Sequence, residues 1–318
     1  MISVLDSVLP VVEGSQDVRT DLDRLADVAG WLAYEELPAP VSFLPSQLHL
    51  NRDETVDFVL AATCLNFAFT DFDTRKRWDL VVDGRVYADS DGLHAALGRA
   101  LGEGVRILDG AWLAQVEEDD LRRLFRGGTS ELQLLDVRAR IWREVGEVLV
   151  ARYDGRFSNV LASSPSRLYD SGDGFLEALT RDFVRFDDRV GDVRFWKLAQ
   201  LAVWILEVEL GGVGFEDLGS LTAFADYIVP AGLHAMDVLR YSDELESAVR
   251  DGVLIDAGSP WEVELRAHTI YAVAQLCERV NELRPPELQV IAPHIDARFW
   301  LPFHKTHAPH HLTRTIYY

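Results

Sequence analysis

Two long segments with almost no polar face constrain the fold of this chain most. Residues 195–210 (FWKLAQLAVWILEVEL) and 261–280 (WEVELRAHTIYAVAQLCERV) are each predicted to form a helix that is buried on nearly all sides. Ser259-Pro260, directly before the second segment, is typical of a helix start. Apolar residues three and four positions apart predict two further helices, over 53–67 and 134–148. We therefore expect a fold that is mainly α.

Strand signals are few, and they concentrate in one place. In 78–89 (WDLVVDGRVYAD), Asp83-Gly84 lies between two Val-containing runs and predicts a minor β-hairpin. No repeat of fixed period is present, and residues 153–173, which are rich in Ser, Gly and Asp, are the softest candidate boundary between lobes. We expect two closely packed lobes: an N-terminal helical lobe with the small β element over 1–160, and a C-terminal helical lobe over 161–318 that carries most of the site.

The charge balance restricts the class of partner. The 318 residues include 31 Lys and Arg against 52 Asp and Glu, which gives a net charge of −21. Such a chain repels polyanions, so broad adhesion to DNA, RNA or anionic lipid is disfavoured, but a small anionic ligand can still bind in a locally basic pocket. Two cysteines, Cys64 and Cys277, cannot build a disulfide framework or a Cys-based zinc site.

Membrane and export signals are missing from the sequence. The N-terminus has no positively charged region, and no apolar run of the length that spans a bilayer occurs. The sequence predicts a soluble protein of the cytoplasm, with no membrane partner.

A lysine stands in the first of the two apolar segments. Lys197, Gln200 and Trp204 lie at positions i, i+3 and i+7, which place them on one helix face. A buried ammonium group needs a partner because its burial alone is costly. Lys197 is therefore either a member of an internal salt bridge or an anion-binding group.

Two isolated acids occur in aromatic surroundings. Asp226 lies in 221–230 (LTAFADYIVP), next to Phe224 and Ala225, and Asp296 is followed by Phe299 and Trp300. A carboxylate in such surroundings is either capped by backbone N–H groups or placed for chemistry. The two acids can bind and activate a cationic planar ligand, or they can both be structural.

His49 stands alone in a loop, where a histidine is most often structural or exposed. The other histidines of interest lie in the last 25 residues. Five of the nine histidines fall in 294–318, among them His304, His307, His310 and His311. Their order lacks the HExxH pattern, and with Arg314 the tail is locally basic. We favour packing or anion contacts over a metal site. The sequence also lacks GxGxxG, GxxxxGK[ST] and GxSxG motifs.

The ordered set of segments resembles one family, the queuosine salvage proteins, which are queuosine 5′-phosphate N-glycosylases/hydrolases. The resemblance spans nearly the whole chain, and its most specific parts are ADYIVP, EVELRAHTI and the HH…TRTIYY ending. The segments that carry it are HLNRDETVDFVLAATCLNFAF (49–69), ALGRALGEGVRILDGAWLA (96–114), LRRLFRGGTSELQLLDVR (121–138), RFSNVLASS (156–164), FWKLAQL (195–201), LTAFADYIVP (221–230), GSPWEVELRAHTIYAV (258–273) and PHHLTRTIYY (309–318).

The resemblance implies a fold similar to the helix-hairpin-helix-type DNA glycosylases. It also implies an enzyme that hydrolyses the N-glycosidic bond of queuosine 5′-monophosphate. The product queuine, a cationic 7-deazaguanine base, is then available for insertion into tRNA by a separate transglycosylase. The substrate is a free nucleotide, so no direct tRNA binding is expected, and no metal or organic cofactor is needed.

The resemblance also gives roles to individual residues. Asp226 matches the aspartate of the family's FADY motif and is the expected catalytic residue, as an electrostatic stabiliser of the ribose charge, as a nucleophile or as an activator of water. Phe224 and Ala225 are expected to help form the wall around the base. Asp296 and Trp300 belong to a motif that reads Asp-x-x-x-Trp-Asp, in which Asp296 faces the guanine-like N–H edge or the amine of queuine.

The other matches concern the base and the phosphate. His49 matches a histidine expected to contact the same ligand, and Lys197, in F-x-K-x-A-Q, is the expected ligand of the 5′-phosphate. Arg314 and the tail histidines are further candidates for that role. Leu301 stands where the family motif usually ends in a second aspartate, so that contact is either lost here or made by another acid.

Two other functions fit parts of the same pattern. A non-catalytic protein that binds queuine or modified nucleosides would share the pocket without cleaving a bond. An enzyme of damaged bases in nucleic acid would share only the fold. The net charge of −21 and the absence of a Lys/Arg-rich stripe disfavour this second function.

Overall fold

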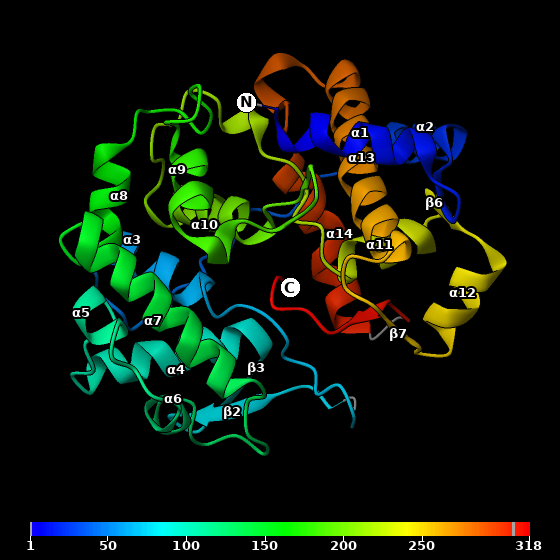
Figure 1. Ribbon diagram of the computed structural model, residues 1–318. Helices are drawn as coiled ribbons and strands as arrows, with labels where there is room; N and C mark the ends of the chain where they lie inside the picture. Colours follow the sequence, from blue (N-terminus) through cyan, green and yellow to red (C-terminus); the bar gives the residue numbers. More distant parts are fainter. Residues whose placement is uncertain (1, 75, 307–308) are drawn as a thin grey trace. The chain divides into compact units, whose positions relative to one another are not determined.

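The chain divides into two compact units, each built from separate stretches of sequence. The computed structural model describes residues 2–74, 76–306 and 309–318 (Figure 1). Unit 1 comprises 1–40, 188–200 and 218–315, and unit 2 comprises 41–187, 201–217 and 316–318. The predicted lobes, 1–160 and 161–318, assume one cut in the chain, and that division stays a prediction.

Helices dominate both units, in agreement with the predicted mainly α class, and each strand has two to four residues. The elements of unit 1 are α1 (Val4–Gly14), β1 (Val18–Thr20), α2 (Leu22–Leu32), β4 (Arg189–Val190), β5 (Val193–Arg194), the first turn of α10 (Lys197–Glu209), η2 (Leu218–Ser220), α11 (Ile228–Ala235), β6 (Leu239–Tyr241), α12 (Asp243–Arg250), β7 (Leu254–Ile255), α13 (Pro260–Leu283), η3 (Pro286–Leu288), α14 (Ala292–Thr306) and β8 (Leu312–Thr313). Its strands pair as β1 with β6, β4 with β5, and β7 with β8, and only the last pair is parallel.

Unit 2 has its own helices and one hairpin. Its elements are α3 (Arg52–Thr63), β2 (Asp79–Val82), β3 (Arg85–Ala88), α4 (Asp89–Gly102), α5 (Gly110–Leu113), α6 (Glu118–Leu124), α7 (Leu135–Arg152), α8 (Phe157–Ser163), α9 (Phe175–Asp182), η1 (Val184–Phe186) and the rest of α10. Among the described residues, no helix is both long enough and apolar enough to cross a bilayer.

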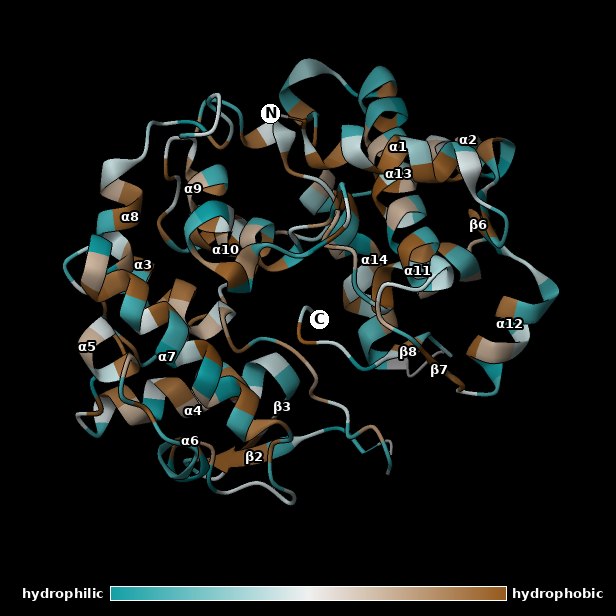
Figure 2. Ribbon diagram, viewed as in Figure 1, coloured by the Kyte–Doolittle hydropathy of each residue, from teal (hydrophilic) through white to brown (hydrophobic). Residues whose placement is uncertain are grey.

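The predicted hairpin is present in unit 2. β2 and β3 pair antiparallel, with Val82 opposite Arg85. The two turn residues, Asp83 and Gly84, both have positive φ, 49° and 77°, as a tight hairpin turn requires. Figure 2 shows the hydrophobic colouring of β2, whose residues Leu80 and Val82 are buried.

The predicted helices are confirmed, although their ends differ from the predicted ranges: α10 begins at Lys197 and α13 extends to Leu283. Residues 135–152 form α7, and the helix expected over 53–67 is α3, which ends at Thr63. Phe67 is buried but lies beyond this helix. The cause is local: after Cys64 the backbone turns back through short-range hydrogen bonds, such as that from Phe67 N to Leu65 O.

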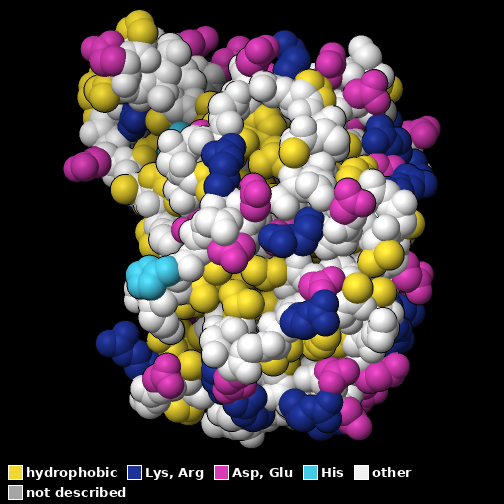
Figure 3. Space-filling model, turned by 90° about the vertical axis from the view of Figure 1, so that its left-hand side faces the viewer, with side chains coloured by type: hydrophobic (Ala, Val, Ile, Leu, Met, Phe, Trp, Pro, Cys, Tyr) yellow, Lys and Arg dark blue, Asp and Glu magenta, His cyan; other side chains and the backbone are white. Residues whose placement is uncertain are grey.

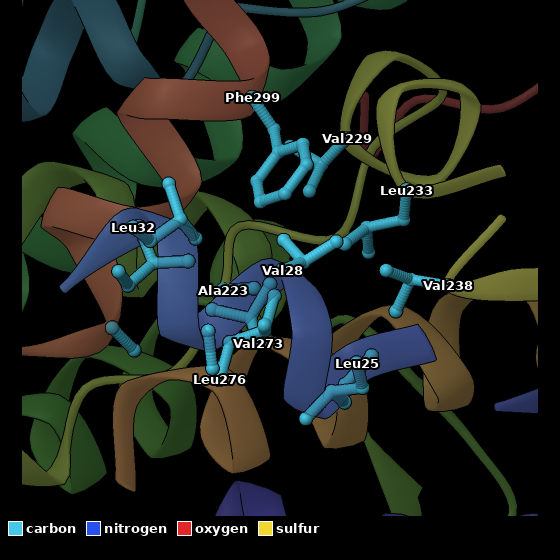
Figure 4. Close-up of a cluster of buried hydrophobic side chains, with 14 of the residues drawn as sticks. Leu25, Val28, Leu32, Ala223, Val229, Leu233, Val238, Val273, Leu276 and Phe299 are labelled. Atoms are coloured by element: carbon cyan, nitrogen blue, oxygen red, sulfur yellow. The ribbon is translucent and has the colours of Figure 1, made fainter. Parts of the chain in front are cut away.

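Helix α13 is the centre of unit 1, where it packs against α1, α2, α11 and α14. It begins as predicted, with Ser259 as N-cap, whose side chain accepts a hydrogen bond from Glu262 N, and with Pro260 in the first turn. Apolar residues of α13 such as Leu276 face a buried cluster with residues of α2, α11 and α14, for example Val28, Leu233 and Phe299 (Figure 4). This cluster anchors the helices from which the site is built.

Removal of a core side chain from α13 should destabilise the protein strongly. Leu276 is fully buried, so Leu276→Ala removes its apolar contacts and leaves a cavity. We expect a loss of about 2–5 kcal/mol in the free energy of unfolding, measured by urea denaturation. Leu283→Ala on the same helix is the matched control, because Leu283 is 53% exposed, and it should change this free energy by no more than about 0.5 kcal/mol. Equal losses in both variants would contradict the assigned core.

Candidate active site

The candidate site is built around an irregular buried segment of unit 1, residues 221–227. It precedes α11 and has no regular secondary structure, so its backbone groups have no helix or sheet partners. Side chains of neighbouring elements supply part of what is missing. Gln200, in the first turn of α10, accepts a hydrogen bond from Thr222 N at 2.9 Å and donates one to Thr222 Oγ1 at 3.0 Å. Gln200, a polar residue in an apolar helix, therefore holds the backbone of this segment in place.

Helix α14 holds the same segment at two points. Asp296 and Trp300 lie four residues apart and so occupy one helix face. Asp296 Oδ2 accepts a hydrogen bond from Phe224 N at 2.9 Å, and Trp300 Nε1 donates to Asp226 Oδ2 at 3.1 Å. The structure thus brings together Phe224, Asp226, Asp296 and Trp300, four of the residues predicted from sequence.

Asp226 is both a capping residue and a candidate for chemistry. Its Oδ1 accepts hydrogen bonds from Ile228 N at 2.7 Å and Val229 N at 3.0 Å, at the start of α11. The structural alternative considered for this acid is therefore realised. Among the described residues, these two N–H groups and the Trp300 indole N–H donate to the Asp226 carboxylate, and an ionised carboxylate offers about four lone-pair sites. Asp226 is only 6% exposed, which keeps its charge in a region of low dielectric.

Asp296 titrates under the influence of Asp226. Burial, and after it the negative charge of Asp226, raise the pKa of Asp296 to about 8, against the opposing effects of the Phe224 N–H donor and the charge of Lys197. At neutral pH the Asp296 carboxyl group therefore carries a proton for most of the time. A neighbouring negative charge in a buried site disfavours ionisation of a second acid, and this effect is seen at Asp296.

Lys197 belongs to the same cluster. It is the first residue of α10, is 8% exposed, and its charge acts on Asp296. Of the two alternatives, proximity to a buried acid is observed, whereas contact with a phosphate stays a prediction.

Phe224 and Ala225 are themselves buried, and the Ala225 carbonyl accepts a hydrogen bond from Arg266 Nε at 3.1 Å. Sequence reasoning missed Arg266. The sequence does contain a signal for Arg266, because a charged residue in a helix predicted to be buried on all sides needs partners. The same argument selected Lys197.

The histidines of the tail pack on aromatic residues beside Asp226. The ring of His304 stacks on Trp300 at 4.2 Å between centroids, and that of His310 stacks on Tyr227 at 4.7 Å. His311 is buried, and burial, followed by the charges of His310 and Arg266, lowers its pKa to about 3. These contacts agree with the packing that we favoured for the tail.

Two tail positions stay outside this cluster. His307 lies outside the described residues. Arg314 follows β8 and is exposed, so its role at a phosphate remains a prediction. Within the described part of the chain, no group of three or more His, Cys, Asp or Glu side chains is placed to hold a metal ion.

His49 belongs to unit 2, whereas the other predicted site residues belong to unit 1. It is exposed in the loop that leads to Asn51, the N-cap of α3, where Asn51 and Glu54 form a capping box. Its contact with the ligand stays a prediction.

Comparison with known proteins links the whole chain to one family. A family model described as queuosine salvage protein matches residues 46–318. A protein of Sphaerobacter thermophilus named queuosine 5′-phosphate N-glycosylase/hydrolase is 37% identical over 100% of this chain and 98% of its own length. Proteins of the same name are 30% identical in Mus musculus, over 100% of this chain and 99% of that protein, and in Nematostella vectensis, over 83% and 82%.

The raised pKa of Asp296 predicts a pH dependence of stability. The folded protein keeps this proton up to about pH 8, whereas the unfolded chain loses it near pH 3.8. Between these values the folded state binds more protons, so the free energy of unfolding should fall as pH rises, by up to about 1.4 kcal/mol per pH unit from this group. Asp296→Asn cannot titrate, so the stability of the wild type relative to this variant should decline from pH 5 to pH 8 in urea denaturation.

A matched variant separates this effect from other titrations. Asp243 is exposed at the start of α12, and the curves of Asp243→Asn and the wild type should run parallel over the same pH range. Parallel curves for Asp296→Asn as well would show that Asp296 does not hold the proton.

Proposed function

This chain belongs to the queuosine salvage protein family, and on that basis we propose that it is a hydrolase that cleaves the N-glycosidic bond of queuosine 5′-phosphate and releases queuine. The observation that carries the proposal within the structure is the buried Asp226 carboxylate, which is fixed by three N–H donors next to the protonated acid Asp296. Cleavage of an N-glycosidic bond is favoured by a negative charge held in place, here Asp226, beside a second polar group, here Asp296.

The chemistry explains why a fixed carboxylate is useful. The bond between C1′ of the ribose and the base nitrogen breaks, water supplies the oxygen that joins C1′, and the base leaves with a proton from solvent or from an acid. Positive charge develops on the ribose as the bond stretches. A carboxylate that is already oriented stabilises this charge without reorganisation, and burial strengthens the interaction. We assign this role to Asp226.

The remaining predicted residues surround this centre in our proposal. Asp296, protonated at neutral pH, can accept a hydrogen bond from the base or donate one to it, because a carboxylic acid has both capacities. Trp300, which holds Asp226, together with Phe224 and Ala225 would border the base. The contact of His49 with the ligand stays an expectation from the family resemblance.

The 5′-phosphate needs a cation, and Lys197 is the group that we assign to it. Its burial supports this assignment, because a desolvated ammonium interacts more strongly with an anion than an exposed one does. Arg314, which is exposed, is a further candidate.

The free nucleotide, and not tRNA, is the substrate that we propose. The net charge of −21 supports this choice, and on the face shown in Figure 3 basic side chains are interspersed with acidic ones and form no continuous stripe. A fold similar to the helix-hairpin-helix-type DNA glycosylases and a cytoplasmic location are further parts of the proposal. No cofactor enters this mechanism.

Asp226→Asn should abolish turnover and leave the fold intact. An asparagine can still cap α11, but it carries no charge to stabilise the ribose. We expect the rate of queuine release from queuosine 5′-phosphate, followed by mass spectrometry, to fall by at least about 100-fold. Asp21→Asn is the matched control, since Asp21 caps α2 of the same unit and should be replaceable at nearly full activity. A wild type that binds the nucleotide and releases no queuine would overturn the proposed function.

Lys197→Ala should weaken the preference for a nucleotide over a nucleoside. If the ammonium binds the phosphate, its loss should lower kcat/KM for queuosine 5′-phosphate about 10-fold or more and leave that for queuosine much less affected. Lys76→Ala, which removes an exposed lysine of unit 2, should change neither value. An equal loss of kcat/KM for both substrates would instead indicate that Lys197 acts through its charge on Asp296.

A further inference from the structure

A buried ion cluster lies behind the segment that carries Asp226. Arg266 of α13 is 1% exposed and makes a bidentate ion pair with Asp188, in which NH1 donates to Oδ1 at 3.0 Å and NH2 donates to Oδ2. NH1 also donates to Glu262 Oε1 at 3.1 Å, one turn earlier on the same helix. The guanidinium carbon lies 3.9 Å from the centre of the Phe195 ring. The position of this side chain is therefore fixed from several directions.

The partners of Arg266 are themselves anchored. Asp188 and Glu262 are 1% and 2% exposed, and the second oxygen of Glu262 accepts a hydrogen bond from Gly258 N at 3.1 Å. The carbonyl of Asp188 accepts hydrogen bonds from Phe195 N and Trp196 N. A guanidinium group held in this way is rigid, because movement would leave buried charges unpaired.

This rigid group donates a hydrogen bond to the backbone of the site. Arg266 Nε donates to the carbonyl of Ala225 at 3.1 Å, and the peptide plane that contains this carbonyl also contains the N and Cα atoms of Asp226. We infer that Arg266 is a positioning residue, which fixes the Ala225–Asp226 peptide and thereby the direction of the Asp226 carboxylate. The inference rests on the proposed function, in which that carboxylate faces the ribose.

The contacts on either side of Ala225 show what this bond adds. Phe224 is held through its N–H by Asp296, and the Asp226 side chain is held by Trp300 and by the start of α11. Without Arg266, the described residues would leave the buried Ala225 carbonyl without a hydrogen-bond donor, and this cost would favour rotation of the peptide. Lysine cannot replace Arg266, because its single ammonium cannot contact Asp188 with two nitrogens and also reach the carbonyl with a third.

A second buried charge on α13 provides a matched control. Glu264, two residues before Arg266, is 7% exposed. Its carboxylate accepts hydrogen bonds from Gln16 N, Asp17 N and Val18 N, which join the end of the α1–β1 loop and the first residue of β1 to α13. Within the described part of the chain, these hydrogen bonds of Glu264 do not involve residues 221–227. Glu264→Gln therefore measures the loss of a buried charged contact on the same helix without disturbance of Ala225.

The first test is kinetic. We expect Arg266→Lys to lower kcat for queuosine 5′-phosphate by about 10- to 100-fold, with KM changed by less than about 3-fold, because a small misplacement of a reacting group affects the transition state most. Glu264→Gln should retain kcat within about 3-fold at a comparable loss of thermal stability. Equal losses of kcat in the two variants would overturn the inference.

The second test needs no activity. The Trp300 indole N–H bonds to Asp226, so the ¹⁹F signal of Trp300 in protein labelled with 5-fluorotryptophan, assigned with Trp300→Phe, reports on the place of that carboxylate. Arg266→Lys should shift this signal, and Glu264→Gln should not. An unchanged signal in Arg266→Lys would overturn the inference even if activity falls.

The two tests separate the inference from the proposed function. An inactive wild type would end the proposed function, while the ¹⁹F comparison would still decide whether Arg266 positions Asp226. An active wild type with an unaffected Arg266→Lys variant would end the inference alone. If Arg266→Lys does not fold, Asp188→Asn takes its place in both tests, because it keeps the arginine and weakens only the contact that orients it.

Discussion

The fold of unit 1 depends on the hydrogen-bond partners that it provides for the backbone of one buried, irregular segment. Residues 221–227 run through the interior without a helix or sheet of their own, so side chains must take the place of backbone partners. Gln200, Asp296 and Arg266 each do this, from three different helices. The same contacts that reduce the cost of burial also hold the backbone at Thr222, Phe224 and Ala225. Asp226 is thus held with little freedom, and the catalytic role that we propose for it would gain from such preorganisation.

A second constraint follows from the closeness of two acids. Asp226 and Asp296 cannot both be ionised at low cost in a buried site, and the structure resolves this by raising the pKa of Asp296. At neutral pH Asp296 then has a proton to donate as well as an oxygen that accepts. Lys197 adds a positive charge to the same region. The net charge of −21 therefore says little about the site itself, where a few buried groups set the local balance.

Much of the fold could be predicted from periodicity. The two apolar segments are helices α10 and α13, and Asp83-Gly84 forms the turn of the hairpin. The end of α3 could not be predicted, because apolar residues such as Phe67 continue past Thr63 although the backbone leaves the helix. Among the site residues, the isolated acids were visible as charges in apolar surroundings. Arg266 was equally visible, but its partner Asp188 lies 78 residues away, and no local pattern links the two.

The sequence by itself determined the helices, the hairpin, the acidic balance and the short list of buried polar residues, because periodicity and the cost of burying charge act locally along the chain. Only the tertiary structure decided which of these residues meet. Phe224, Asp226, Asp296 and Trp300 come together because α14 packs beside α11, over 60 residues after the segment that it holds. The protonation of Asp296 is likewise a tertiary property, since it arises from burial and from a neighbouring charge that the sequence places far away.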